Sequence, residues 1–282
     1  MQLIQDPFEM TSWSAAQRRQ GLRIGFVPTM GALHAGHLDL VGRALAQFDV
    51  VATSIFVNPL QFNDPQDFSS YPLRPEEDRG LLEGAGCNVL FAPTQDLLFA
   101  HHHQKDYELG GLDSHWEGPQ RPGHFQGVVN VVDRLFGCVR PDGACFGMKD
   151  RQQLAIIQWV TKNLRWPIDI IPCPTVREPD GLAMSSRNIK LSPSQRTAAP
   201  ALYRALKAIE VNSNDMPLGE CMHLGRLELD KEPGIRLEYL GIADAETMQP
   251  CAAWPDHGEV IAMIAAQLGT VRLIDNLTIR RG

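Results

Sequence analysis

The sequence contains no CxxC pair, although it has six cysteines. They are scattered along the chain, at Cys87, Cys138, Cys145, Cys173, Cys221 and Cys251. This spacing argues against a zinc site and against a disulfide framework, so we expect reduced and mostly buried thiols. Histidines occupy positions 101–103, but three adjacent side chains cannot all face one ion from a regular element. They favour an exposed polar loop over a metal site.

Long basic clusters and long apolar runs are also absent. The chain has 26 Lys and Arg against 33 Asp and Glu, a formal net charge of −7, whereas nucleic-acid binding requires a cationic footprint. No apolar run approaches the roughly 20 residues that span a bilayer, and the first residues lack a basic segment followed by an apolar core. We therefore expect a cytoplasmic protein with no nucleic-acid partner and no membrane partner.

The length and the order of patterns indicate two domains. The 282 residues, 44% of them hydrophobic, exceed the usual size of one domain and can form a sizeable core. In the first half, short β-rich runs alternate with helical patterns, which is typical of an α/β fold with helices on both faces of a parallel sheet. The expected strands are 23–27, 50–57, 88–91, 144–146 and 168–171, and the expected helices lie near 37–48, 75–84, 128–137 and 152–163.

The pattern changes after residue 174. A polar loop over 177–188 precedes Ser192, Pro193 and Gln195, whose spacing is that of a capping box with proline at the first helical position. It predicts a helix over 193–210, followed by a helix at 218–229 and strands at 237–242, 260–267 and 271–274. We therefore predict a Rossmann-like domain over 1–174 and a smaller α+β domain over 175–282.

The most informative segment is PTMGALHAGH at 28–37, which joins an expected strand to an expected helix. A strand that ends in a glycine-containing turn before a helix presents backbone N–H groups and the positive end of the helix dipole, which is where phosphates bind. His34 and His37 are three residues apart and share a face if the turn is helical. A bare HxxH is more often polar surface, but this context favours a nucleotide site.

At these residues the chain resembles the nucleotidyltransferase and class I aminoacyl-tRNA synthetase superfamily, whose mark is HxGH. The wider string resembles the pantoate–β-alanine ligase family in particular. Further matching strings follow in the family's order: FVNPLQF at 56–62, RPGHFQGV at 121–128, FGMKD at 146–150 and DGLAMSSRN at 180–188. The resemblance implies condensation of (R)-pantoate with β-alanine through a pantoyl adenylate, with ATP as substrate and release of AMP and diphosphate. It also implies Mg²⁺ and a homodimer.

The resemblance assigns catalysis to His34, His37, Lys149, Ser185, Ser186 and Arg187. It assigns ATP binding to Met30, Gly31, Ala32, Leu33, His34, Ala35, Gly36, His37, Gly147, Met148, Lys149, Asp150, Val176, Met184, Ser185, Ser186 and Arg187. The segment 184–187 resembles the mobile KMSKS loop of the synthetases, in which hydroxyls and a cation contact the triphosphate. Taken alone, SSR has commoner uses in caps and turns. Lys149 and Asp150 alone could equally form a surface ion pair.

The resemblance places Gln61 and Gln153 on the pantoate side of the pocket. Neutral amides suit hydroxyl and carboxylate groups, although either one could be a buried structural amide. Asp78 is the candidate Mg²⁺ ligand, and an exposed acidic helix start over 76–78 explains it equally well.

Three single positions depart from the family pattern, and residues 98–103 replace a familiar MYP string of the family. Leu73 moves the usual arginine by one position, Met148 stands where an acidic residue is common, and Asn130 replaces a frequent threonine. The alternatives to the ligase are another HxGH nucleotidyltransferase and a non-catalytic nucleotide-binding module. Gln61 and Gln153, in place of a basic pocket for a phosphorylated acceptor, favour the ligase. The second domain is expected to act as a lid that shields the adenylate from water.

Overall fold

The structure is a computed structural model that describes residues 1–63, 68–100, 103–256 and 258–281. The chain forms two compact units. The first contains Met1–Met148 and Ile156–Pro174, and the second contains Lys149–Ala155 and Thr175–Gly282. The structure thus groups 149–155 with the second unit, whereas the predicted domain limits place them in the first.

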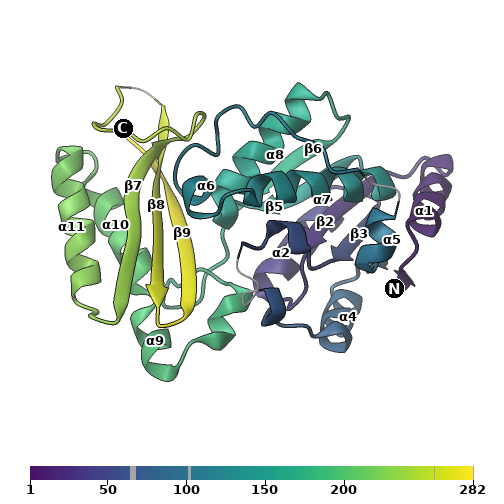
Figure 1. Cartoon of the computed structure of the whole chain (residues 1–282), viewed down its shortest axis with the longest axis horizontal. Helices are drawn as coiled ribbons and strands as arrows, with labels where there is room; N and C mark the ends of the chain where they lie inside the picture. The colour runs from purple at the N-terminus through teal and green to yellow at the C-terminus, as the bar shows by residue number, and fades with distance from the viewer. Residues whose placement is uncertain (64–67, 101–102, 257, 282) are drawn as a thin grey trace. The chain divides into compact units, whose positions relative to one another are not determined.

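The first unit is built on a six-stranded parallel sheet of order β1-β4-β3-β2-β5-β6 (Figure 1). Reading the strands outward from β2 shows that the order reverses between β2 and β5, which is where ligands bind in open α/β sheets. The sheet confirms the predicted fold class. Its strands are β1 Gln2–Ile4, β2 Ile24–Thr29, β3 Val50–Ile55, β4 Val89–Phe91, β5 Gly143–Gly147 and β6 Asp169–Cys173.

Helices cover both faces of this sheet because successive strand residues point to opposite sides. Phe26 contacts Phe136 of α7 edge-on, whereas Val27 belongs to the apolar cluster that contains Val41 and Ala44 of α2. The α-helices are α1 Pro7–Arg19, α2 Ala35–Leu45, α4 Pro75–Gly84, α5 Gln95–Phe99, α6 Glu117–Gln120, α7 His124–Val139 and α8 Arg151–Asn163. Two 3₁₀ turns are η1 Pro59–Gln61 and η2 Met148–Asp150.

The second unit packs helices against a three-stranded antiparallel sheet of order β7-β8-β9. Its elements are η3 Ser186–Lys190, α9 Pro193–Ala198, α10 Ala201–Asn212, α11 Leu218–Asp230, β7 Ile235–Asp244, β8 Glu259–Leu268 and β9 Val271–Arg280. Apolar residues of α10 such as Leu202 and Leu206 share a core with Ile264 of β8. The smaller α+β domain is therefore confirmed as a fold.

Two features of the chain differ from the predicted elements. The predicted helix over 193–210 is wrong as one element, because Pro200 separates α9 from α10 and proline cannot donate the hydrogen bond that a continuous helix requires. The sequence interpretation also missed β1 and α1. The capping box at Ser192 is present as predicted.

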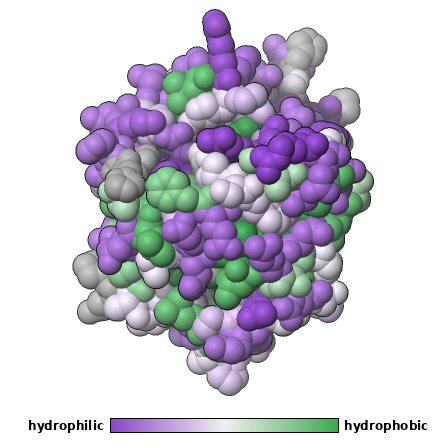
Figure 2. Space-filling view, turned by 90° about the vertical axis from the view of Figure 1, so that its right-hand side faces the viewer, coloured by the Kyte–Doolittle hydropathy of each residue, from purple (hydrophilic) through white to green (hydrophobic). Residues whose placement is uncertain are grey.

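The surface and the cysteines agree with an ordinary globular composition. All six cysteines are free, and only Cys251 is not buried. One face of the molecule carries many hydrophilic residues with apolar residues between them (Figure 2). In the part of the chain that the structure describes, no helix is both long and apolar enough to cross a bilayer. His101 and His102 lie outside the described residues.

Candidate functional site

The turn after β2 has an unusual backbone that one carboxylate holds in place. Gly31 has φ +82 and Ala32 has φ +49. This left-handed backbone conformation is energetically unfavourable for a residue with a Cβ atom, such as Ala32. Both oxygens of Asp78, in the first turn of α4, accept hydrogen bonds from this turn: Oδ2 from the amide of Ala32 at 2.8 Å and Oδ1 from the amide of Leu33 at 2.7 Å. Asp78 thereby satisfies two buried donors and fixes the turn.

Asp78 is buried and does not belong to an exposed acidic helix start. Its exposed fraction is 1%, so that interpretation of the acidic turn is wrong for this residue. Burial raises the pKa of the Asp78 carboxyl, and the hydrogen bonds from Leu33 and Ala32 oppose that rise. A Cβ atom at Gly31 would lie 3.0 Å from Oδ2 of Asp78, which explains why the turn needs glycine there.

His34 and His37 form a capping box at the start of α2. The Nδ1 atom of His34 accepts the amide of Gly36 at 3.1 Å, and the Nδ1 atom of His37 accepts the amide of His34 at 3.3 Å. The two ring centroids are 4.1 Å apart. Because each Nδ1 accepts a hydrogen bond, the proton of the neutral ring is on Nε2. Each neutral ring thus carries an Nε2–H donor near the N-terminus of α2, where the helix dipole favours phosphate. The main-chain amides of residues 31–34, 36 and 37 already have acceptors within this turn or in Asp78 and Thr29.

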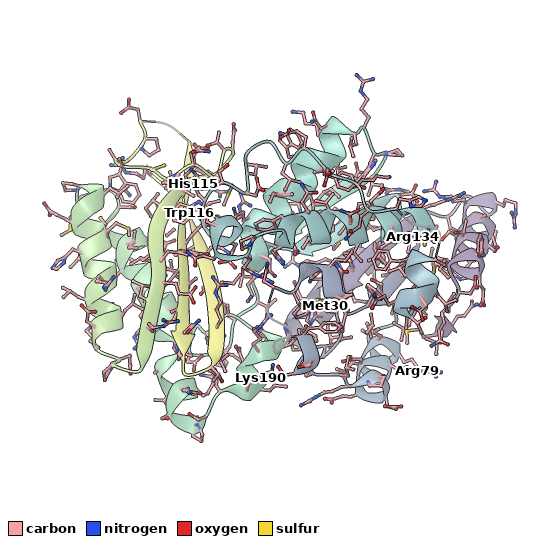
Figure 3. The ribbon with its side chains drawn as sticks, in the orientation of Figure 1. Met30, Arg79, His115, Trp116, Arg134 and Lys190 are labelled. Atoms are coloured by element: carbon pink, nitrogen blue, oxygen red, sulfur yellow. The ribbon has the colours of Figure 1, made fainter. Side chains whose placement is uncertain are left out.

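Gln61 lies in η1 beside the same turn. Its Nε2 atom donates to the sulfur of Met30, the residue that follows β2 (Figure 3), and its Oε1 atom accepts from Asn58 at 3.3 Å. The main-chain oxygen of Gln61 accepts from Nδ1 of His124 at 2.7 Å and from Arg121 at 3.2 Å. The segment RPGHFQGV therefore holds η1 in place through its side chains.

The packing between η1 and α7 leaves no room for a side chain at Gly127. A Cβ atom there would lie 2.1 Å from the main-chain oxygen of Leu60, and the oxygen of Gly127 accepts from Asn58 at 3.0 Å. Gln61 is buried, which agrees with a structural amide. Its position beside Met30 is also compatible with substrate binding. Its role in pantoate binding stays a prediction.

The candidate residues after β5 occupy η2 and the first turn of α8. Gly147 ends β5, and Met148, Lys149 and Asp150 form η2. Lys149 is half-buried, and its Nζ atom is 3.8 Å from an oxygen of the exposed Asp150. The ion pair that the bare sequence suggests is thus present but long, and the role of Lys149 in phosphate binding stays a prediction. Gln153 is half-buried in α8.

The loop that resembles KMSKS follows a short hairpin in the second unit. The amide of Met184 donates to the oxygen of Val176 at 3.0 Å. The hydroxyl of Ser185 accepts the amide of Arg187 at 3.2 Å and caps η3. Ser185 therefore performs the capping role that a lone SSR string suggests. Its role, and that of Ser186 and Arg187, in phosphate binding stays a prediction.

The donor set does not fit a metal held by protein side chains alone. Among the residues that the structure describes, no group of three or more His, Cys, Asp and Glu could hold a metal ion. Both oxygens of Asp78 already accept backbone amides in a buried turn. Asp78 therefore does not fit as a Mg²⁺ ligand, and its geometry assigns it to the turn.

The whole chain can be placed among known proteins. A model of the Pantoate-beta-alanine ligase family matches residues 2–278. The chain belongs to this family. Membership confirms the resemblance and the prediction of a ligase, and the alternatives of another HxGH nucleotidyltransferase or a non-catalytic module are not favoured.

Relatives in this family match over nearly their full length. The pantothenate synthetase of Cytophaga hutchinsonii is 43% identical over 267 residues, which cover 94% of either chain. That of Rubrobacter xylanophilus is 45% identical over 287 residues, which cover 97% of either chain. A crystal structure of the pantothenate synthetase from Thermus thermophilus matches with a TM-score of 0.91 and 42% identity, covering 98% of this chain and 99% of that one.

A structure with bound ligands also matches this chain. The pantoate-beta-alanine ligase from Francisella tularensis, complexed with beta-gamma ATP and beta-alanine, matches with a TM-score of 0.80 and 33% identity. The match covers 98% of this chain and 97% of that one.

The three departures from the family pattern have distinct surroundings. Leu73 is 71% exposed, and the neighbouring Arg74 pairs with Glu77 at 3.0 Å. Asn130 is buried, and its amide donates to the oxygen of Lys105 and accepts from the amide of Lys105, both at 2.9 Å. The single hydroxyl of a threonine could not bond both the amide and the oxygen of Lys105 in this way. Met148 is half-buried in η2, and nothing in the structure explains its choice over an acidic residue.

Several residues with clear structural duties escaped the sequence interpretation. Asn58 and His124 hold η1. The half-buried Arg177 forms a polar network in the second unit with the buried Asp275 and Asn276. The signal for the last three was present, because two adjacent polar residues interrupt the apolar string of β9.

Proposed function

We propose that this chain condenses (R)-pantoate with β-alanine to pantothenate, using ATP and releasing AMP and diphosphate. The observation that carries the proposal is the histidine turn at the carboxyl end of β2, which presents two Nε2–H donors at the N-terminus of α2 in a chain of this family. Family membership over residues 2–278 supports the choice of substrates.

In the first step, a carboxylate oxygen of pantoate attacks the α-phosphorus of ATP, the bond to the β-phosphate bridging oxygen breaks, and diphosphate leaves with that electron pair. In the second step, the amine of β-alanine attacks the acyl carbon of pantoyl adenylate, loses a proton and expels AMP. Both steps depend on positioning and on neutralising phosphate charge.

We assign the residues of this chain to that chemistry as follows. His34 and His37 donate Nε2–H to the phosphates, and the turn over 30–37 cradles the nucleotide. Lys149 and Arg187 neutralise the charge that develops on diphosphate, and the hydroxyls of Ser185 and Ser186 donate hydrogen bonds to it. Further ATP contacts are Gly147, Met148, Asp150, Val176 and Met184. Gln61 and Gln153 orient pantoate, and the second unit closes over the adenylate to exclude water.

Three further inferences rest on the family resemblance. Mg²⁺ accompanies ATP and reduces the charge of the triphosphate, and because Mg²⁺ usually keeps several waters, phosphate oxygens and water can hold it without Asp78. The enzyme functions as a homodimer, and it is cytoplasmic.

Product analysis with a panel of acids tests this function. With ATP, Mg²⁺, pantoate and β-alanine, the purified protein is expected to produce pantothenate and AMP in equal amounts, and no ADP. Omission of pantoate should abolish AMP formation. AMP formation with an unrelated acid and none with pantoate, or formation of ADP, would show that the assignment is wrong.

A further inference from the structure

Two adjacent polar residues, Asp275 and Asn276, are buried in β9. Their exposed fractions are 4% and 5%, although neighbouring strand residues point to opposite faces. Buried and half-buried residues alternate from Val271 to Asp275, and Asn276 breaks this alternation because it is buried as well. A buried polar side chain is costly unless it is hydrogen-bonded. The partners of these two residues therefore determine what they do.

Asp275 binds Arg177 through a two-pronged ion pair. The NH1 atom of Arg177 is 2.6 Å from Oδ2 of Asp275, and its NH2 atom is 3.0 Å from Oδ1. Burial raises the pKa of the Asp275 carboxyl, and the guanidinium of Arg177 opposes that rise. The guanidinium also lies 4.0 Å from the ring centroid of Tyr203. The ion pair and the Tyr203 ring together therefore fix the orientation of the Arg177 guanidinium.

The same guanidinium holds the hairpin that leads into the loop at 184–187. NH1 of Arg177 donates to the oxygen of Gly181 at 3.1 Å, and Arg177 pairs with Ala183 in an antiparallel bridge. Gly181 has φ +92, and a Cβ atom there would lie 2.2 Å from the Tyr203 ring. The side chain of Asn188 donates to the oxygen of Ala183 at 3.0 Å. Both ends of the loop are thus tied to the hairpin.

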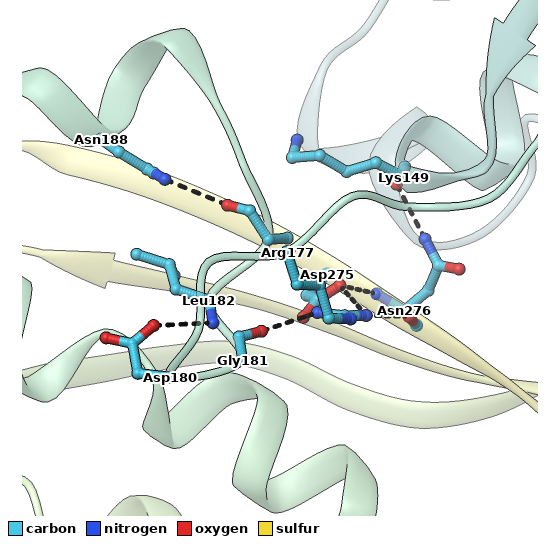
Figure 4. Close-up of polar contacts among 9 residues, drawn as sticks. Lys149, Arg177, Asp180, Gly181, Leu182, Asn188, Asp275 and Asn276 are labelled. Carbon is cyan, nitrogen blue, oxygen red and sulfur yellow. Dashed lines mark hydrogen bonds and ion pairs between the residues drawn. The ribbon is translucent and has the colours of Figure 1, made fainter. Parts of the chain in front are cut away.

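Asn276 connects this hairpin to the segment that carries Lys149. Its Nδ2 atom donates to the main-chain oxygen of Lys149 at 2.8 Å, and its own main-chain oxygen accepts from NH2 of Arg177 at 3.1 Å. Figure 4 shows the resulting chain of contacts from Lys149 through Asn276 and Asp275 to Arg177 and Gly181. All of these residues belong to the second unit.

We propose that Arg177, Asp275 and Asn276 form one positioning device, which holds the main chain of Lys149 and the loop at 184–187 in a fixed spatial relation for adenylate formation. The proposal rests on the function proposed above for Lys149, Ser185, Ser186 and Arg187. None of the three residues needs to touch the nucleotide. They act through the segments that they hold.

A buried ion pair is a poor device for stability alone. Apolar residues of similar volume often replace such a pair at no cost to stability, or with a gain. A guanidinium fork, in contrast, fixes direction as well as distance. Misplacing a catalytic group by about 1 Å can cost on the order of 100-fold in rate. The bidentate contact of Arg177 can thus hold the Lys149 segment and the loop at 184–187 in a precise relative position.

The decisive variant replaces the whole pair by apolar residues, Arg177→Met with Asp275→Leu. We expect the variant to remain folded, with a melting temperature somewhat below that of the wild type because the main-chain oxygens of Gly181 and Asn276 and the amide of Asn276 lose their partners. We expect the rate of pantoate-dependent adenylate formation to fall by about 10- to 100-fold and the KM for pantoate to stay unchanged. The matched control is Arg272→Lys, on the same strand, where Arg272 pairs with Glu238 at 2.9 Å. A stable double variant with the wild-type rate would overturn the proposal.

A mutant cycle tests whether the residues act as one device. Arg177→Lys keeps the charge and loses the fork, and Asn276→Ala removes the bond to Lys149. If the two act together, the combined rate loss will be smaller than the product of the single losses. A combined loss equal to that product would show two independent sites and overturn the proposal.

Amide hydrogen exchange gives a readout that does not depend on activity. In Asn276→Ala, peptides around 147–152 are expected to exchange faster, and in Arg177→Lys those around 178–190, with no change in Arg272→Lys. Unchanged exchange in both variants would contradict the device. A wild type without pantoate-dependent activity would instead contradict the proposed function, so the two failures are distinguishable.

Discussion

Replacement of His37 by alanine is expected to slow AMP formation by about 10²- to 10⁴-fold, the range expected when a positioned donor of hydrogen bonds or protons is lost. The fold should survive, because the ring is half-buried and its Nδ1 accepts the amide of His34 at the long distance of 3.3 Å. The measurement is single-turnover AMP formation together with the melting temperature. His223→Ala, at an exposed position in α11, is the control.

A second substitution at the same position separates two roles of the ring. Because Nδ1 accepts a backbone amide, the neutral ring carries its proton on Nε2 and acts as a hydrogen-bond donor. A glutamine amide can also donate there, so His37→Gln should recover part of the rate. A His37→Gln variant as slow as His37→Ala would indicate proton transfer, and a His37→Ala variant at the wild-type rate would remove His37 from the mechanism.

Asp78→Ala is expected to have the second largest effect, on both stability and rate. It leaves the buried amides of Ala32 and Leu33 without their carboxylate, at a cost of about 1–3 kcal/mol for each unsatisfied group. It also releases the left-handed conformation of Ala32. The turn that positions the histidines should then relax, so that the melting temperature and the rate of adenylate formation fall together.

A Mg²⁺ titration separates this role from metal binding. If Asp78 holds the turn, excess Mg²⁺ will not restore the rate of Asp78→Asn, and the melting temperature will be low without nucleotide. Glu77→Ala, at the neighbouring exposed position of α4, should resemble the wild type in both measurements. A stable Asp78→Asn variant whose rate recovers at high Mg²⁺ would show that Asp78 binds the metal.

The β2–turn–α2 unit and the histidine pair could be predicted because their signals are local. A β-rich run, two glycines and an amphipathic helix lie within about 20 residues. The spacing of His34 and His37 indicates that they lie together, although the structure pairs them through a capping box, with His34 in extended conformation before the helix and not on a shared helical face. The parallel α/β sheet follows from the alternation of elements in the first half, but the order of its strands was not predicted. These features need no knowledge of distant contacts.

The support of the site could not be predicted in the same way. Glu76, Glu77 and Asp78 are three acidic residues in one helical turn, and only the packing of α4 decides which of them faces the turn after β2. Arg177 and Asp275 are 98 residues apart, so no local pattern pairs them. β1 has three residues, too few for periodicity to be detected. Pro200 indicates a break between α9 and α10. The prediction of one helix rested on the capping box at Ser192, which defines only where the helix begins.

The exchange of labelled diphosphate into ATP tests the central claim, an acyl-adenylate formed at the histidine turn, most directly. The first step is reversible and does not involve β-alanine, so the protein should catalyse this exchange with ATP, Mg²⁺ and pantoate alone. The exchange should depend strictly on pantoate and be lost in His37→Ala. Exchange without pantoate, or pantothenate formation without any such exchange, would contradict a pantoyl adenylate.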